Sequence, residues 1–189
     1  MVNFENDIKN CIHILEDSGI ILYPTDTIWG IGCDATNGNS VEKIFALKNR
    51  SDKKSMIILV ADEKDIFNYV EEPPKKIFNY LSVTNKPTTV IYDRAKNLAQ
   101  NLISNGTIAI RIVKDDFCKE LLSQFKKPIV STSANISGEP FAKNFNDISA
   151  QIKNGVDYIV QHRRNDLMSS QPSSIIKSDE EGNIIFLRT

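Results

Sequence analysis

The sequence predicts one mixed α/β (α+β) domain in which helices cover a sheet. Short apolar runs alternate with amphipathic stretches along all 189 residues. The composition, 41% hydrophobic and 25% charged, is that of a globular chain with one sizeable core. No internal repeat, low-complexity tract or linker divides the chain, so we expect a single domain over 1–189.

The N-terminal part predicts a helix, a strand, a loop and a second helix. Amphipathic spacing predicts a helix over 4–18, with His13 on its apolar face and Gly19 as its stop. The apolar run 19–23 then predicts a buried strand that leads into a polar loop. Ser40 is expected to cap the second helix.

Further strands and helices alternate to the end of the chain. Apolar runs predict strands at 55–62, 88–93, 107–113, 127–133 and 158–162. Helical stretches are expected near 64–81, broken by Pro73-Pro74, and near 95–103, 115–125 and 146–153. Residues 173–188 predict a hairpin around an acidic turn. The order of the strands does not follow from the sequence.

Charge and cysteine content restrict the function classes. Lys and Arg number 23 against 24 Asp and Glu, so overall charge does not predict a polyanionic partner and any such attraction must be local. The chain has no apolar run long enough for a membrane span, and its acidic N-terminal residues argue against a signal peptide. Three widely spaced cysteines without a CxxC pair favour neither a disulfide framework nor a zinc site. These features predict a cytoplasmic protein that makes no membrane contact.

A first polar cluster follows the predicted strand, in "YPTDTIWGIGC" at 23–33. Hydroxyl groups and glycine amides at a strand end can hold a carboxylate or a phosphate, although a turn with locally satisfied side chains is the alternative. Residues 30–35 also fit G-x-G-x-x-A, but the loop continues to Ser40 before a helix begins, which makes a dinucleotide site a poor interpretation.

Two further clusters carry cations and hydroxyls. The stretch "LKNRSDKK" at 47–54 has a local charge of 4 − 1 = +3, and Lys48 and Arg50 lie where the helix should end. The run "PIVSTSANISG" at 128–138 has four hydroxyls and an amide at a strand end, where open α/β sheets bind ligands. No G-x-x-x-x-G-K-[ST], HExxH or G-x-S-x-G pattern is present, so kinase-like, zinc-hydrolase and serine-hydrolase sites are not indicated.

Taken together, "YPTDTIWGIGC", "KNR" and "STSANISGEP" resemble the YrdC/Sua5 family, the L-threonylcarbamoyladenylate synthases, in the short TsaC/YrdC form. The resemblance covers about residues 15 to 188 and implies a twisted mixed sheet, a YrdC-like fold, with a concave basic pocket. It implies that L-threonine, bicarbonate or CO2, and Mg²⁺-ATP give threonylcarbamoyl-AMP and pyrophosphate. This is the first step towards the N6-threonylcarbamoyl group of tRNA, and a downstream threonylcarbamoyl-transferase complex would use the product. No resident metal is expected.

The resemblance also implies roles for individual residues. Lys48 and Arg50 would be catalytic by neutralising the triphosphate. L-Threonine would bind to Thr25, Thr27, Ser131 and Arg111. ATP would bind to Lys48, Arg50, Lys54, Ser133, Asn135 and Arg188.

The chain departs from the family pattern near the expected nucleotide. Ser51 replaces a common proline, Lys54-Ser55 replaces Asn-Pro, and the stretch before Pro87 lacks a glycine. Two other functions stay open: a module that binds tRNA or double-stranded RNA on its basic face, and a YciO-type paralogue with another substrate. A passive RNA-binding module would show salt-dependent affinity without needing threonine or ATP.

Overall fold

A computed structural model of the chain describes residues 4–49, 56–167, 171–179, 181 and 183–189. In this part of the chain nine strands form a sheet in the order β7-β1-β2-β6-β3-β5-β4-β8-β9. The strands are β1 (Ile21–Tyr23), β2 (Gly30–Gly32), β3 (Ile57–Val60), β4 (Thr88–Tyr92), β5 (Ile108–Ile112), β6 (Ile129–Ser133), β7 (Tyr158–Ile159), β8 (Ser174–Ser178) and β9 (Ile184–Arg188). Three neighbouring pairs, β1–β7, β3–β5 and β4–β8, are parallel and the others are antiparallel. The predicted mixed sheet is confirmed.

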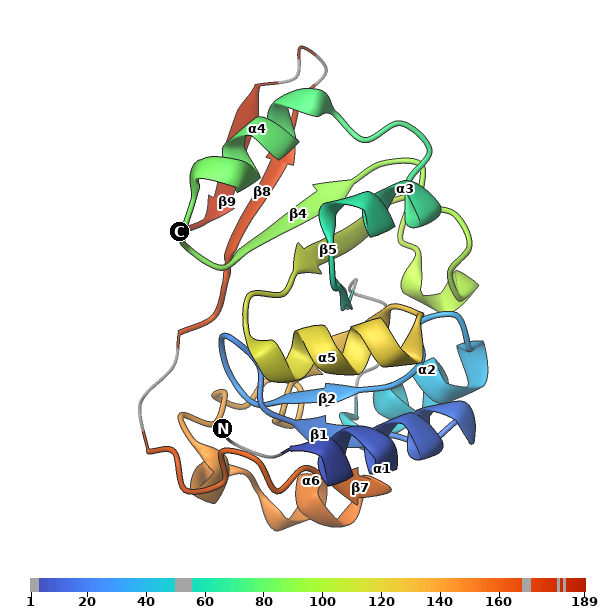
Figure 1. Cartoon of the computed structure of the whole chain (residues 1–189), viewed down its shortest axis with the longest axis vertical. Coiled ribbons are helices and arrows are strands. Elements are labelled where there is room, and N and C mark those ends of the chain that lie inside the picture. Colours follow the sequence, from blue (N-terminus) through green and yellow to red (C-terminus); the bar gives the residue numbers. More distant parts are fainter. Residues whose placement is uncertain (1–3, 50–55, 168–170, 180, 182) are drawn as a thin grey trace.

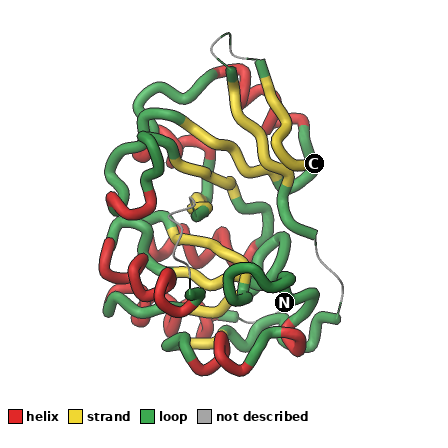
Figure 2. Tube along the Cα trace, turned by 180° about the vertical axis from the view of Figure 1, so that it is seen from behind, coloured by secondary structure: helices red, strands yellow, loops and turns green. Residues whose placement is uncertain are grey.

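Helices pack on this sheet. They are α1 (Glu5–Glu16), α2 (Gly38–Leu47), α3 (Ile66–Tyr69), α4 (Lys75–Val83), α5 (Asp116–Phe125) and α6 (Ala150–Asn154), with short 3-10 turns η1 (Glu63–Asp65), η2 (Gln100–Leu102) and η3 (Phe145–Asp147). Figure 1 shows α1 and α5 next to each other over β1 and β2, and α4 beside β8 and β9. Seen from behind, strands lie in both the upper and the lower part of the molecule (Figure 2).

Two apolar clusters form the core. One joins Ile8 and Leu15 of α1 to Leu121 of α5 and to Ile21 of β1. The larger one surrounds α2 and the middle strands and includes Ile58 of β3. Burial on both faces explains why the central strands are continuous apolar runs instead of alternating ones.

Strand β2 is the main element that the sequence does not predict. Gly30-Ile31-Gly32 was expected to belong to a ligand-binding loop, but it pairs antiparallel with both β1 and β6. A Cβ atom on Gly32 would lie 2.6 Å from the carbonyl oxygen of Val130 and 2.7 Å from the ring of Tyr23. Gly32 therefore serves close packing inside the sheet, and its place in a strand agrees with the rejection of a dinucleotide loop.

Several other predictions are corrected by the structure. Asn37, not Ser40, caps α2, because its side chain accepts from the backbone N–H groups of residues 39 and 40. The helix expected near 95–103 is only the turn η2, the strand expected over 158–162 is only β7, and His13 is exposed. The helices on either side of Pro73-Pro74 and the hairpin of β8 and β9 are confirmed.

No helix in the described ranges has the length and apolar character needed to cross a membrane.

Candidate functional site

A cavity of about 340 Å³ lies against the middle of the sheet, where seven strands contribute residues. Its lining consists of Thr27, Ile28, Gly30, Met56, Ile57, Thr89, Ile91, Ala109, Arg111, Ser131, Thr132, Ser133, Phe141, Pro172, Ser173, Ile175 and Arg188. The walls thus combine apolar strand residues with hydroxyl groups and two guanidinium groups. This cavity brings together five of the residues expected in the site: Thr27, Arg111, Ser131, Ser133 and Arg188.

Arg111 of β5 is the central charged group of the cavity. Its Nη1 donates to Oγ1 of Thr27 at 2.9 Å, and its Nη2 lies 3.4 Å from Oγ1 of Thr25. Nη2 also lies 3.1 Å from Oδ1 of Asp26, and both side chains of this ion pair are buried. The Nε of Arg111 is buried and has no hydrogen-bond partner within the described residues. A buried donor without a partner is costly, so an acceptor supplied by a ligand would relieve it.

The charges around the cavity favour an anion. Its lining includes Arg111 and Arg188 and no carboxylate. Arg188 is held by two hydrogen bonds, from Nε at 3.0 Å and Nη2 at 2.8 Å, to the carbonyl oxygen of Ser173. Burial, and then the positive charge of Arg111, lower the pKa of Arg188. A negatively charged ligand would stabilise the charge of Arg188, which burial and Arg111 disfavour.

The two threonines of the PTDT stretch have different positions. Thr27 lines the cavity, whereas Thr25 is buried behind it and donates to the carbonyl oxygen of Ile28 at 2.8 Å. Oγ1 of Thr25 also accepts from the backbone N–H of Thr27. Thr25 therefore shapes the turn, and Thr27 is the threonine that a ligand in this cavity would meet. Tyr23, from the same cluster, is a core residue whose hydroxyl donates to Val130.

The hydroxyl-rich end of β6 contributes Ser131 and Ser133 to the cavity. Asn135 does not line it: its Nδ2 donates to the carbonyl oxygens of Ile136 at 3.0 Å and Glu139 at 2.6 Å. Asn135 thus folds the loop after β6 on itself, while the serines at the end of β6 line the cavity.

Lys48, at the end of α2, has a buried position that the sequence does not predict. Its ammonium group donates to the carbonyl oxygens of Ser133 at 2.5 Å and Asn135 at 2.6 Å. Lys48 therefore fastens the end of β6 and the loop after it to α2, and it is absent from the cavity lining. Arg50, Ser51 and Lys54-Ser55 lie outside the described residues.

Some residues of the cavity were not expected to belong to it. Oγ1 of Thr89 lies 2.7 Å from Oγ of Ser173, and both line the cavity, as does the ring of Phe141. Thr89 and Ser173 belong to a Thr-Thr and a Ser-Ser pair, and such hydroxyl pairs beside apolar runs were a signal that could have identified them.

The described residues contain no group of three or more His, Cys, Asp or Glu side chains placed to hold a metal ion. The cavity itself supplies only hydroxyl and carbonyl oxygens to a hard cation. These groups fit a Mg²⁺ ion that arrives on a polyphosphate and keeps its water ligands, not one held by the protein alone.

Comparison with known proteins gives a family and an activity. The Sua5/YciO/YrdC family model, described as "Telomere recombination", matches residues 13–189. The threonylcarbamoyl-AMP synthase of Idiomarina loihiensis is 33% identical over 159 residues, which cover 82% of this chain and 85% of that protein.

Solved structures share the fold. Sua5 of P. abyssi, crystallised with L-threonine, has a TM-score of 0.86 at 21% identity; the match covers 97% of this chain but only 54% of that one. YciO of E. coli has a TM-score of 0.83 at 20% identity, and the match covers 97% of this chain and 89% of YciO. The expected twisted mixed sheet is therefore the fold of these proteins.

Proposed function

The chain belongs to the Sua5/YciO/YrdC family, and we propose that it is a threonylcarbamoyl-AMP synthase, an enzyme of the nucleotidyltransferase class. The proposed reaction joins L-threonine, bicarbonate or CO2, and ATP into threonylcarbamoyl-AMP with release of pyrophosphate and, when bicarbonate is the carbon source, of water. The observation that carries this proposal is the cavity in which Thr27, Arg111 and Ser131 lie together with Arg188.

The amino acid would bind at the Arg111 side of the cavity. A carboxylate placed there would accept from the buried Nε of Arg111, which lacks a partner in the described structure, and would be balanced by the guanidinium charge. The hydroxyls of Thr27 and Ser131 would fix its orientation. This arrangement selects a small zwitterion with a hydrogen-bonding side chain over a purely apolar amino acid.

The nucleotide would extend towards Arg188 and Ser133. In the transfer step a carbamate oxygen of carboxylated threonine attacks the α-phosphorus, the bond between that phosphorus and the bridging oxygen breaks, and pyrophosphate leaves. No covalent protein intermediate is needed, so positioning and cations supply most of the rate. Mg²⁺ would be bound by the phosphates of ATP and would neutralise their charge. Arg50 and Lys54, outside the described residues, keep their proposed place at the triphosphate.

The product must be consumed by a group transfer to tRNA, and we assign that step to a separate threonylcarbamoyl-transferase complex in the cytoplasm. The geometry favours this function over a tRNA- or double-stranded-RNA-binding module or a YciO-type paralogue, because the cavity brings hydroxyl groups together with Arg111 in a set suited to an amino acid.

The test is pyrophosphate release by the purified protein with Mg²⁺-ATP. We expect release only when both L-threonine and bicarbonate are present, and little when L-serine replaces L-threonine. Release that is independent of threonine, or no release from folded protein that binds ATP, would refute the proposal.

A pair of variants ties the activity to the cavity. Arg188→Ala should reduce kcat/KM at least about tenfold, because it removes a cation from the lining. Arg94→Ala is the matched control, since Arg94 is exposed and pairs with Glu72 on the surface. Equal activity of the two variants would remove Arg188 from the site.

A further inference from the structure

A second cavity, larger than the first, lies at the opposite ends of β3 and β6. The first cavity includes Met56 and Ile57, where β3 begins, whereas this one includes Val60 and Ala61, where β3 ends. Its volume is about 580 Å³, and it shares no lining residue with the first. Its lining consists of Val60, Ala61, Asp62, Lys64, Asp65, Asn68, Tyr69, Lys119, Leu122, Ser123, Lys126, Lys127 and Pro128. We call it the α5 groove.

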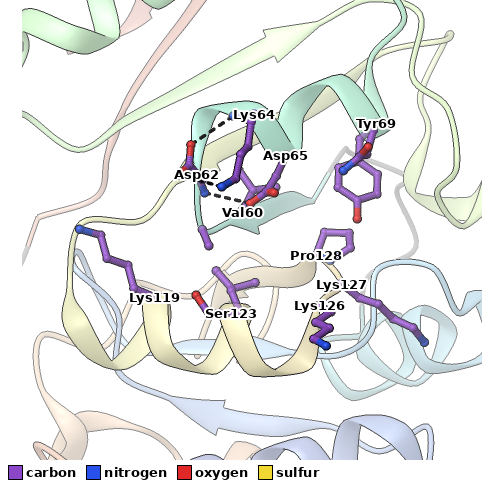
Figure 3. A pocket seen from close by; sticks show the side chains of 13 residues that line it. Val60, Asp62, Lys64, Asp65, Tyr69, Lys119, Ser123, Lys126, Lys127 and Pro128 are labelled. Atoms are coloured by element: carbon purple, nitrogen blue, oxygen red, sulfur yellow. Dashed lines mark hydrogen bonds and ion pairs between the residues drawn. The ribbon is translucent and has the colours of Figure 1, made fainter.

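The groove has two walls of different character (Figure 3). Lys119 and Ser123 lie one turn apart on the same side of α5, and Lys126 is the left-handed residue that ends this helix (Figure 3). Asp62, Lys64, Asp65 and Tyr69 lie on the facing side, in η1 and α3 and just before them. Val60, Leu122 and Pro128 add apolar surface between the two walls.

The carboxylates of the groove are already engaged. Asp62 accepts from the backbone N–H of Lys64 and pairs with its ammonium group at 3.8 Å, while Asp65 accepts from the backbone N–H of Asp62 at 3.0 Å. Together they form a capping box that starts η1. The carboxylates of Asp62 and Asp65 therefore stabilise the turn that they belong to.

The wall formed by α5 has hydrogen-bond donors that are not used within the described residues. Lys127 is paired with Asp34 at 2.7 Å, but Lys119, Ser123 and Lys126 have no side-chain hydrogen bond or ion pair within the described residues. The hydroxyl of Tyr69 and the amide of Asn68 are likewise without side-chain partners there. Counting four lysines against Asp62, Asp65 and the Asp34 partner leaves a charge of 4 − 3 = +1. Asp65 is held by a backbone N–H, whereas the ammonium groups of Lys119 and Lys126 have no acceptor in the described part of the chain.

We propose that the α5 groove binds a phosphate-bearing small molecule of about nucleotide size. Lys119 and Lys126 are seven residues apart, so their backbone positions differ by about 10 Å along the helix, more than one carboxylate spans. A ligand with phosphate groups at one end and a flat or apolar group at the other matches two ammonium groups, a central hydroxyl and the ring of Tyr69. The volume lies in the range of sites for such ligands.

The experiment is a titration of ¹⁵N-labelled protein, without Mg²⁺, threonine or bicarbonate, with inorganic tripolyphosphate and separately with AMP. We expect saturable shifts of the backbone signals of Asn68, Ser123 and Lys126. The double variant Lys119→Gln/Lys126→Gln should weaken binding in the groove at least about tenfold. Stronger binding of AMP than of tripolyphosphate would identify a nucleotide, and the reverse a free polyphosphate.

The control is the charge-matched double variant Lys9→Gln/Lys75→Gln, which changes two exposed lysines of α1 and α4 and should bind as the unchanged protein does. Ser123→Glu, at an exposed position, adds a negative charge in mid-groove and should also abolish binding. Shifts confined to residues of the first cavity, or groove shifts that persist in both groove variants, would overturn the proposal. Because both titrations measure binding and not catalysis, their outcome is independent of the proposed synthase activity.

Discussion

Asp26 and Arg111 form an ion pair inside the protein, with Oδ1 of Asp26 3.1 Å from Nη2 of Arg111 and the side chains 7% and 4% exposed. Burial raises the pKa of Asp26, and the positive charge of Arg111 works in the opposite direction. Asp26 does not line the cavity, so it acts on a ligand through Arg111. It is a positioning residue for the guanidinium that faces the proposed amino acid.

We predict that Asp26→Asn lowers the free energy of unfolding at neutral pH by about 3 kcal/mol, because Arg111 is left as an uncompensated buried charge. The KM for L-threonine should rise, since the guanidinium loses one of the groups that orient it. Urea unfolding and steady-state kinetics measure the two effects. The double variant Asp26→Asn/Arg111→Met should recover much of the stability but no activity; a double variant less stable than Asp26→Asn would contradict this account.

Lys48 gives a second prediction. Lys48→Met removes the ammonium group from the buried carbonyl oxygens of Ser133 and Asn135 and should cost about 2 kcal/mol of stability. Because the end of β6 and the loop after it then lose their attachment to α2, kcat/KM should fall at least about tenfold. Lys43→Met is the matched control: Lys43 lies on the same helix and donates to the carbonyl oxygen of Ser18, away from the cavity. Similar losses of activity in both variants would show that Lys48 does not position the cavity lining specifically.

The sequence predicted the site better at the level of segments than of contacts. Hydroxyl-rich strand ends identified Thr27 and Ser131 because such polarity next to a buried strand is visible in one sequence. The position of Lys48 was not visible, because a lysine after a helix is usually solvated and only the folded loop supplies the carbonyl oxygens that hold it.

Sheet order sets the limit of what could be predicted. Thr89 of β4 and Ser173 beside β8 are 84 residues apart in the chain, and they meet because β4 and β8 are parallel neighbours. Strand β2 was hidden by its glycines, which lower strand propensity but are required where β2 lies against Tyr23 and Val130. Both facts depend on tertiary neighbours and not on local pattern.

His162 provides a prediction about pH. It stacks on Phe117 with ring centroids 5.6 Å apart and lies 5.1 Å from the ring of Phe4. Burial, and then Arg163, lower its pKa below 6.5, while Asp7 and Asp115 oppose the shift. The unfolded chain therefore binds the proton more readily, so this group's contribution to stability is present above about pH 6.5 and is lost as pH falls through the lowered pKa.

We expect His162→Phe, which keeps the ring contacts, to show a smaller drop of the unfolding midpoint between pH 7 and pH 5 than the unchanged protein. Thermal unfolding at a series of pH values measures this. His13→Phe, at an exposed position, is the control and should leave the slope as it is. An identical pH slope in the His162 variant would mean that other groups cause the loss.

Arg163 leads to the last prediction, which concerns the turn behind the cavity. Its Nη1 donates to the carbonyl oxygen of Thr25 at 2.9 Å, and Nε and Nη2 both lie 3.2 Å from Oδ2 of Asp166. A segment near the C-terminal end thus holds the 24–28 turn that presents Thr27 to the ligand. Arg163→Ala should raise the KM for L-threonine several-fold with a smaller change in kcat, because the turn loses orientation while the reacting groups remain. Arg163→Lys should restore part of the affinity for threonine through a single hydrogen bond.

The neighbouring Arg164 is the control, since its side chain donates to Ile159 and Val160 instead, and Arg164→Ala should leave the KM for threonine unchanged. If the two alanine variants raise KM equally, the segment acts only through general stability and Arg163 does not position the turn.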